Sequence, residues 1–103
     1  MYSPMGSNID IVSTKLEGLT ERLREEFHVA ALHVFGSVAR NEAGAESDLD
    51  VLVDFADAPT FARFMDLKFL LEDKLQMRVD LVTRDALRPP MKTRILAEAR
   101  RVA

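Results

Sequence analysis

The segment Asp48–Phe55 constrains the fold of this chain more than any other, because Asp or Leu alternates with apolar side chains along it. Side chains on a β-strand point to opposite faces in turn, so a period of two predicts a strand with two unlike faces. One of these faces is wholly apolar and consists of Leu49, Val51, Val53 and Phe55. It has to be buried, which requires a second layer of structure packed on the sheet.

The rest of the chain supplies that layer and more of the sheet. The apolar segments Val29–Phe35 and Arg78–Thr83 predict two further strands. Apolar residues at spacings of three and four predict amphipathic helices over 9–27, over 57–75 (beginning at Asp57-Ala58-Pro59) and over 91–102. The expected fold is α/β in the broad sense (α+β), a small mixed sheet of three or four strands with helices packed on one face.

The composition limits the number of domains and the class of partner. With 103 residues and 48% hydrophobic residues, the chain is expected to form one domain over 9–103, preceded by a flexible N-terminus at 1–8. A net charge of −3 lacks the positive field of proteins that bind nucleic acid through phosphates, so no direct DNA binding is expected. The absence of cysteine and of a bilayer-spanning apolar run favours a cytoplasmic protein without a membrane partner.

Three acidic residues have the spacing of a metal site. Asp48 and Asp50 share one face of their strand, with attachment points about 6–7 Å apart. Asp80 lies in the otherwise apolar segment Val79–Val82, where an acid without a partner is costly to bury. If the two strands are neighbours, the three carboxylates converge, and Mg²⁺ is the cation that suits such oxygen ligands.

A second pattern predicts a phosphate site. Gly36 and Ser37 follow the apolar segment 29–35, so they are expected to end a strand and begin a helix. Glycine lets the backbone approach a ligand, the serine hydroxyl can donate a hydrogen bond, and N–H groups at a helix start suit a phosphate. Acids for a metal beside a phosphate cradle indicate a nucleoside triphosphate as the ligand.

These motifs resemble those of the minimal nucleotidyltransferase family of the DNA polymerase beta superfamily. The resemblance covers nearly the whole chain from about Ile9 and implies a nucleotidyltransferase fold. It implies that Gly36-Ser37 binds the triphosphate and that Asp48 and Asp50 chelate two Mg²⁺ ions. It also implies that Asp80 binds the catalytic ion and helps to deprotonate the attacking hydroxyl. The matching segments are Gly36-Ser37-Val38-Ala39-Arg40, Ser47-Asp48-Leu49-Asp50-Val51 and Val79-Asp80-Leu81-Val82.

The resemblance further implies a partner and a reaction. Only one helix is expected after Asp80, so a second protein is expected to help present the acceptor. Similar minimal nucleotidyltransferases are commonly the antitoxins of two-component systems whose toxin is a HEPN-domain ribonuclease. The resemblance implies transfer of AMP from ATP to a tyrosine hydroxyl of such a toxin. Two alternatives stay open: a non-catalytic antitoxin that acts by binding alone, and an enzyme that modifies a small molecule such as an aminoglycoside.

Two of the site residues also have a structural interpretation. Asp80 could form an ion pair with Arg78 or Arg84 instead of binding a metal. Arg40 is expected about one turn into the short helix, where it could reach the triphosphate or bridge to a nearby glutamate. It is retained as a nucleotide-binding candidate with Gly36 and Ser37.

Other charged residues are interpreted as structural. Asp54 shares the parity of Asp50 but lies further along the strand, so it is interpreted as a strand-end acid. The basic residues Arg94, Arg100 and Arg101 are interpreted as parts of a solvated helix face, with contact to an acidic partner as the alternative.

Overall fold

The computed structural model describes residues 8–36 and 48–103. All three predicted strands are present, and a short fourth strand follows the last helix. The elements in chain order are α1 (Asn8–Leu16), η1 (Glu17–Leu19), α2 (Thr20–Phe27), β1 (Val29–Phe35), β2 (Leu49–Phe55), α4 (Phe61–Leu75), β3 (Val79–Thr83), η2 (Arg84–Ala86), α5 (Met91–Glu98) and β4 (Arg100–Arg101).

The strands form one mixed sheet in the order β3-β2-β1-β4. The central strands β1 and β2 pair antiparallel, β2 and β3 pair parallel, and β4 pairs antiparallel with β1. Parallel neighbours need a crossover connection, and α4 provides it between β2 and β3. The expected fold class, a small mixed sheet with packed helices, is confirmed.

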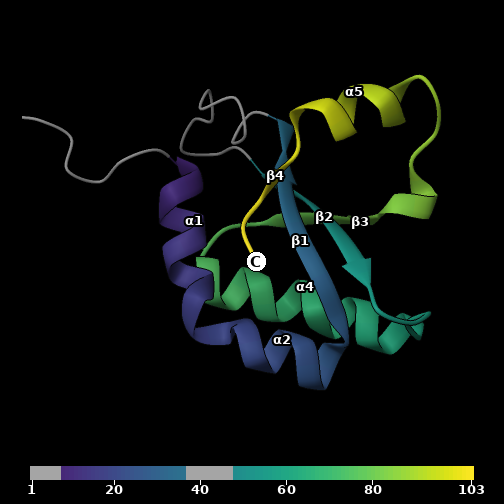
Figure 1. The fold of residues 1–103 in the computed structure, drawn as a ribbon. Coiled ribbons are helices and arrows are strands. Elements are labelled where there is room, and N and C mark those ends of the chain that lie inside the picture. Colours follow the sequence, from purple (N-terminus) through teal and green to yellow (C-terminus); the bar gives the residue numbers. More distant parts are fainter. Residues whose placement is uncertain (1–7, 37–47) are drawn as a thin grey trace, which may run out of the picture.

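The two faces of the sheet are covered unequally (Figure 1). The apolar face of β2 packs with α1, α2 and α4 into the main core, in which Leu49, Leu67 and Leu71 are fully buried. The opposite face carries a smaller cluster of Phe35, Leu52 and the α5 residue Ile95. The expectation that the helices pack on one face is therefore wrong for α5, which packs on the side opposite α1, α2 and α4. No helix among the described residues has both the length and the apolar character needed to cross a membrane.

The first helical segment differs from the single helix expected over 9–27. A 3-10 turn over Glu17–Leu19, which contains Gly18, separates α1 from α2. Glycine is a poor residue for a helix interior because its backbone loses the most freedom on ordering. Helix α2 ends at Phe27, and its C-cap is His28, whose backbone has a left-handed conformation and whose N–H donates to the carbonyl oxygen of Leu23. The chain then enters β1 directly.

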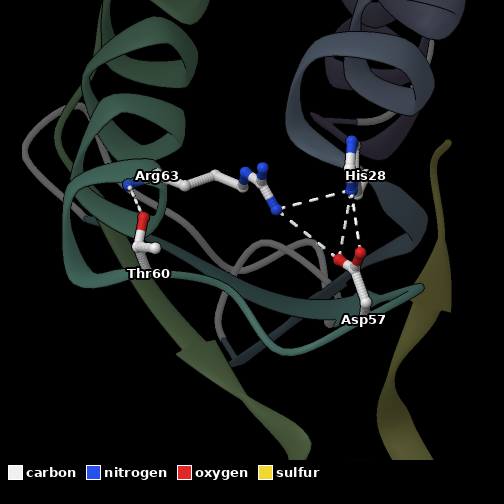
Figure 2. Close-up of polar contacts among 4 residues, drawn as sticks. All are labelled: His28, Asp57, Thr60 and Arg63. Atoms are coloured by element: carbon white, nitrogen blue, oxygen red, sulfur yellow. Dashed lines mark hydrogen bonds and ion pairs between the residues drawn. The ribbon is translucent and has the colours of Figure 1, made fainter.

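Helix α4 begins later than the sequence pattern indicated. Asp57-Ala58-Pro59 was the expected start, but the N-cap is Thr60, whose hydroxyl accepts from the Arg63 N–H at 3.1 Å. Thr60 has the three-residue spacing that such a cap requires. Asp57 instead lies 3.0 Å from His28 Nδ1, and Arg63 Nη1 lies 3.5 Å from Asp57 Oδ1. Figure 2 shows how these side chains tie the end of α2 to the loop before α4.

The last helix is shorter than expected. Instead of continuing to 102, α5 ends at Glu98, and Arg100 and Arg101 pair with the free edge of β1. The next residue, Val102, donates its N–H to the Leu32 carbonyl oxygen at 2.9 Å and is itself 9% exposed. A sheet edge has backbone groups that need partners, and the end of the chain satisfies them.

Candidate active site

A cavity of about 420 Å³ opens where the end of β1 and the starts of β2 and β3 meet helix α5. One side of the cavity is polar and contains the acids Asp50 and Asp80 beside Gly36. The other side is apolar and is formed by β1, β3, α5 and the segment before α5. The described residues that line it are Phe35, Gly36, Asp50, Asp80, Val82, Leu87, Met91, Arg94, Ile95 and Glu98. Of the sequence-predicted site residues that the structure describes, Gly36, Asp50 and Asp80 thus line the cavity.

The sheet register brings Asp50 and Asp80 side by side. They are directly paired residues of the parallel strands β2 and β3. Paired residues of neighbouring strands lie about 4.8 Å apart and point to the same face, so the two carboxylates share one surface. Asp50 is half-buried and Asp80 is exposed. Two carboxylates this close favour a bound cation, because a cation between them offsets their mutual repulsion.

The position of Asp80 is fixed from the α4 side. The Val79 N–H donates to Glu72 Oε2 at 2.9 Å, and Lys68 Nζ donates to the same oxygen at 3.0 Å. The hydrogen bond from Val79, followed by the one from Lys68, lowers the pKa of Glu72 below its ordinary value. A carboxylate on α4 therefore holds the first residue of β3, next to Asp80, in place.

Gly36 meets Asp50 from the β1 side. Phe35 pairs with Asp50 across the antiparallel strands, so the next residue, Gly36, lies beside the Asp50 carboxylate. Gly36 has φ 74°, a left-handed conformation that favours glycine. A Cβ atom at this position would collide with Asp50 Oδ2. The missing side chain is thus what lets the backbone approach the acid.

The third predicted acid is directed elsewhere. Asp48 precedes β2, and its Oδ1 lies 3.1 Å from Arg78 Nε, with both side chains at least half exposed. Within residues 8–36 and 48–103, no three His, Cys, Asp or Glu side chains gather closely enough to hold a metal ion. The structure therefore brings Asp50 and Asp80 together, but it does not bring Asp48 to them. Ser37 and Arg40 lie outside the described residues.

Two cavity residues were not recognised as site residues in the sequence. Arg94 had been interpreted as part of a solvated helix face, but both it and Glu98 line the cavity from α5. The Gly36 N–H donates to Glu98 Oε1 at 3.0 Å, which joins the end of α5 to the end of β1. The available signal was the spacing of Arg94 and Glu98, which puts them on one helix face beside the apolar residues Met91 and Ile95.

A larger cavity, of about 550 Å³, lies at the opposite end of β2 and β3. It contains Asp54 and Arg84, which form a two-pronged ion pair with distances of 2.9 and 2.8 Å. His33 Nδ1 lies 3.9 Å from Asp54 Oδ2, and burial lowers the pKa of His33. Because Arg84 already neutralises Asp54 there, these groups brace the sheet. The smaller cavity is therefore the better candidate active site.

The pair of Asp54 and Arg84 predicts a defined pH dependence of stability. The hydrogen bond from Arg84 lowers the pKa of Asp54 below its ordinary value of 3.8. The pair's contribution is therefore complete above that value and is lost as the pH falls through the lower pKa of the folded state. Asp54→Asn should lower the free energy of unfolding at pH 7 by about 1 kcal/mol, a value that allows for the partial exposure of both groups. Urea unfolding from pH 7 down to pH 3 measures this.

The difference in unfolding free energy between the wild-type chain and Asp54→Asn should become smaller below about pH 4. A difference that stays constant across this range would contradict the assignment. Asp66→Asn, a change of an exposed acid on α4, serves as the matched control.

Comparison with known proteins gives the same fold and names its family. The family model described as "Nucleotidyltransferase domain" matches residues 16–103. Protein adenylyltransferase MntA of Thermococcus cleftensis is 38% identical over 90 residues, which cover 87% of this chain and 91% of that protein. Both matches span most of the chain, and the family model includes every described residue of the candidate site.

Solved structures with this fold are also known. A candidate minimal nucleotidyltransferase is 33% identical, with a TM-score of 0.74, and the match covers 95% of this chain and 98% of that one. Another structure contains a tri-AMPylated Shewanella oneidensis HEPN toxin in complex with an MNT antitoxin. The matching chain is 18% identical, and the match covers 92% of this chain and 71% of that one. Its TM-score of 0.65 indicates a shared fold.

Proposed function

Because this chain belongs to the nucleotidyltransferase domain family, we propose that it is a protein adenylyltransferase that transfers AMP from ATP to a HEPN-domain toxin. The acceptor is a tyrosine hydroxyl of the toxin, and the modification makes this chain the antitoxin of the pair. Residues 9–103 act as one catalytic domain in the cytoplasm. The name of the Thermococcus relative supports the adenylyl group, and the shared fold with the MNT antitoxin supports the partner.

The observation that carries this proposal is the junction of Gly36, Asp50 and Asp80 in one cavity. Gly36, directly after β1, and Asp80 on β3 lie on either side of Asp50, and the three residues line the same space. A phosphate chain bound along the Gly36 backbone would lie beside both carboxylates. Nucleotidyl transfer requires that the phosphates lie next to acids that bind cations.

The donor set fits Mg²⁺. Asp50 and Asp80 offer carboxylate oxygens in neighbouring register positions, and a hard cation of this kind prefers oxygen ligands. The exposed ion pair of Asp48 with Arg78 is worth about 0–1 kcal/mol, so Asp48 can leave it to join the other two acids. Asp48, Asp50 and Asp80 would then hold two ions, which neutralise the phosphate charges and lower the pKa of the acceptor hydroxyl.

The reaction is a direct displacement at the α-phosphorus of ATP. The acceptor oxygen forms a new bond to that phosphorus, the bond to the bridging oxygen breaks, and pyrophosphate leaves with the electron pair. Asp80 accepts the hydroxyl proton, since it is the exposed member of the acid pair. Gly36, with Ser37 and Arg40, orients the phosphate chain.

A second candidate function is neutralisation of the toxin by binding alone. The arrangement of Asp48 favours it, because this side chain contacts Arg78 and no three acids gather within the described residues. A chain that only covers its partner needs no metal site. This alternative predicts that the acids can be replaced without loss of protection.

Coexpression with the HEPN toxin separates the two functions. Cells that express the toxin are scored for growth with the wild-type chain and with the double variant Asp48→Ala/Asp50→Ala, and copurification checks that the complex still forms. Adenylyl transfer predicts growth with the wild type and arrest with the double variant. Full growth with a double variant that leaves the toxin unmodified would overturn the enzymatic proposal and support neutralisation by binding.

A further inference from the structure

We propose that Arg94 binds the β- and γ-phosphates of the nucleotide, and that α5 is therefore part of the substrate site. The inference rests on the proposed function, since it assigns a further residue to the same triphosphate. None of the recognised motifs contains Arg94, which follows the last of them, Val79-Asp80-Leu81-Val82, in the sequence.

The position of α5 brings Arg94 to the nucleotide. Arg94 lines the cavity that also contains Gly36, Asp50 and Asp80. The neighbouring residue Ile95 is 3% exposed and packs with Phe35 on the same face of the sheet. A buried neighbour fixes the rotation of the helix, so Arg94 is held at the rim of the cavity.

A hydrogen bond attaches the same helix to the predicted phosphate turn. Glu98 follows Arg94 by one helical turn, and its Oε1 accepts the Gly36 N–H at 3.0 Å. Gly36 is the residue at which the phosphate chain is expected to pass the backbone. The hydrogen bond between Gly36 and Glu98 therefore sets how far the Arg94 backbone lies from the expected position of the phosphates. Glu98 thus acts as a positioning residue.

The charges of the cavity give Arg94 its role. Among the cavity residues that the structure describes, Asp50, Asp80 and Glu98 are acidic and Arg94 is the only basic one. Two metal ions held by the acids would neutralise part of a triphosphate, and the outer phosphates would keep negative charge. A guanidinium suits this position because it donates two parallel hydrogen bonds to phosphate oxygens. Arginine is thus the residue expected to complete the charge balance.

Direct binding of nucleotide tests the assignment without requiring transfer. The full chain is titrated with AMP-PNP and, separately, with AMP, both in the presence of Mg²⁺, by isothermal calorimetry. Arg94→Gln should weaken AMP-PNP by about tenfold, the size of one charge-assisted contact, and should change AMP by less than about twofold. Arg94→Lys should fall between Arg94→Gln and the wild type, since it keeps the charge but loses the paired donors.

Arg100→Gln is the matched control, because Arg100 is exposed on β4 and is not among the cavity residues. It should bind AMP-PNP like the wild type, and thermal unfolding should show that all variants are folded. Wild-type affinity of Arg94→Gln for AMP-PNP, or an equal loss for AMP and AMP-PNP, would overturn the inference while leaving the proposed function intact. A folded wild-type chain that binds no AMP-PNP would overturn both.

Discussion

Replacing Asp50 with alanine should lower the rate of AMP transfer by about 1,000-fold or more. Asp50 lies between Gly36 and Asp80, so it is the acid that faces both the phosphate turn and the second carboxylate. Its loss removes a metal ligand and the charge that places cations beside the phosphates. The measurement is the initial rate of AMP transfer to the purified toxin from α-labelled ATP, with Mg²⁺ at saturation.

Asp50→Asn separates the charge from the shape of the side chain and should be nearly as inactive. Asp66→Asn, a change of an exposed acid on α4, should transfer at the wild-type rate. Both variants should unfold at temperatures near that of the wild type, because neither residue belongs to the buried core. More than about a tenth of the wild-type rate in Asp50→Ala would mean that this acid does not hold the reacting groups.

Gly36→Ala should lower the rate of transfer by about 100-fold and cost about 1–2 kcal/mol of stability. The left-handed backbone at φ 74° disfavours a side chain, and the added Cβ would collide with Asp50 Oδ2. Either the turn or the carboxylate has to move, and a displacement of about 1 Å at a reacting group is enough for such a loss. Initial rates and urea unfolding measure the two effects separately.

Gly18→Ala provides the control for this glycine. An added Cβ at Gly18 meets no atom within 4 Å, so activity should be unchanged and the helical segment should not lose stability. Equal effects of the two substitutions would show that Gly36 acts only through general backbone flexibility. Loss of activity in Gly36→Ala alone would assign the effect to its contact with Asp50.

The strands and the acid pair could be predicted from the sequence because both depend on local patterns. The alternation around Asp50 defines which side chains share a face, and burial of Leu49 and Val51 fixes that choice. The pairing of Asp50 with Asp80 needed one long-range assumption, that β2 and β3 are neighbours. The crossover helix α4 makes that neighbour relation the common outcome in a βαβ unit.

The contribution of α5 could not be predicted in the same way. Arg94 and Glu98 look like ordinary exposed helix residues, and their role depends on which face of the sheet α5 covers. The strand order decides that face. Strand β4 pairs with the free edge of β1, so α5, which connects β3 to β4, crosses the sheet on the side opposite α4. Side-chain partners are equally long-range: Arg78 and Arg84 were considered as alternative partners of Asp80, but they contact Asp48 and Asp54.

The intact mass of the purified HEPN toxin, before and after incubation with this chain, ATP and Mg²⁺, tests the central claim most directly. Adenylyl transfer predicts an increase equal to one or more AMP groups, absent when Asp50→Ala replaces the wild-type chain and mapped by fragmentation to a tyrosine. A toxin of unchanged mass that is nevertheless held in a stable complex and inhibited would contradict adenylyl transfer and leave protection to binding alone.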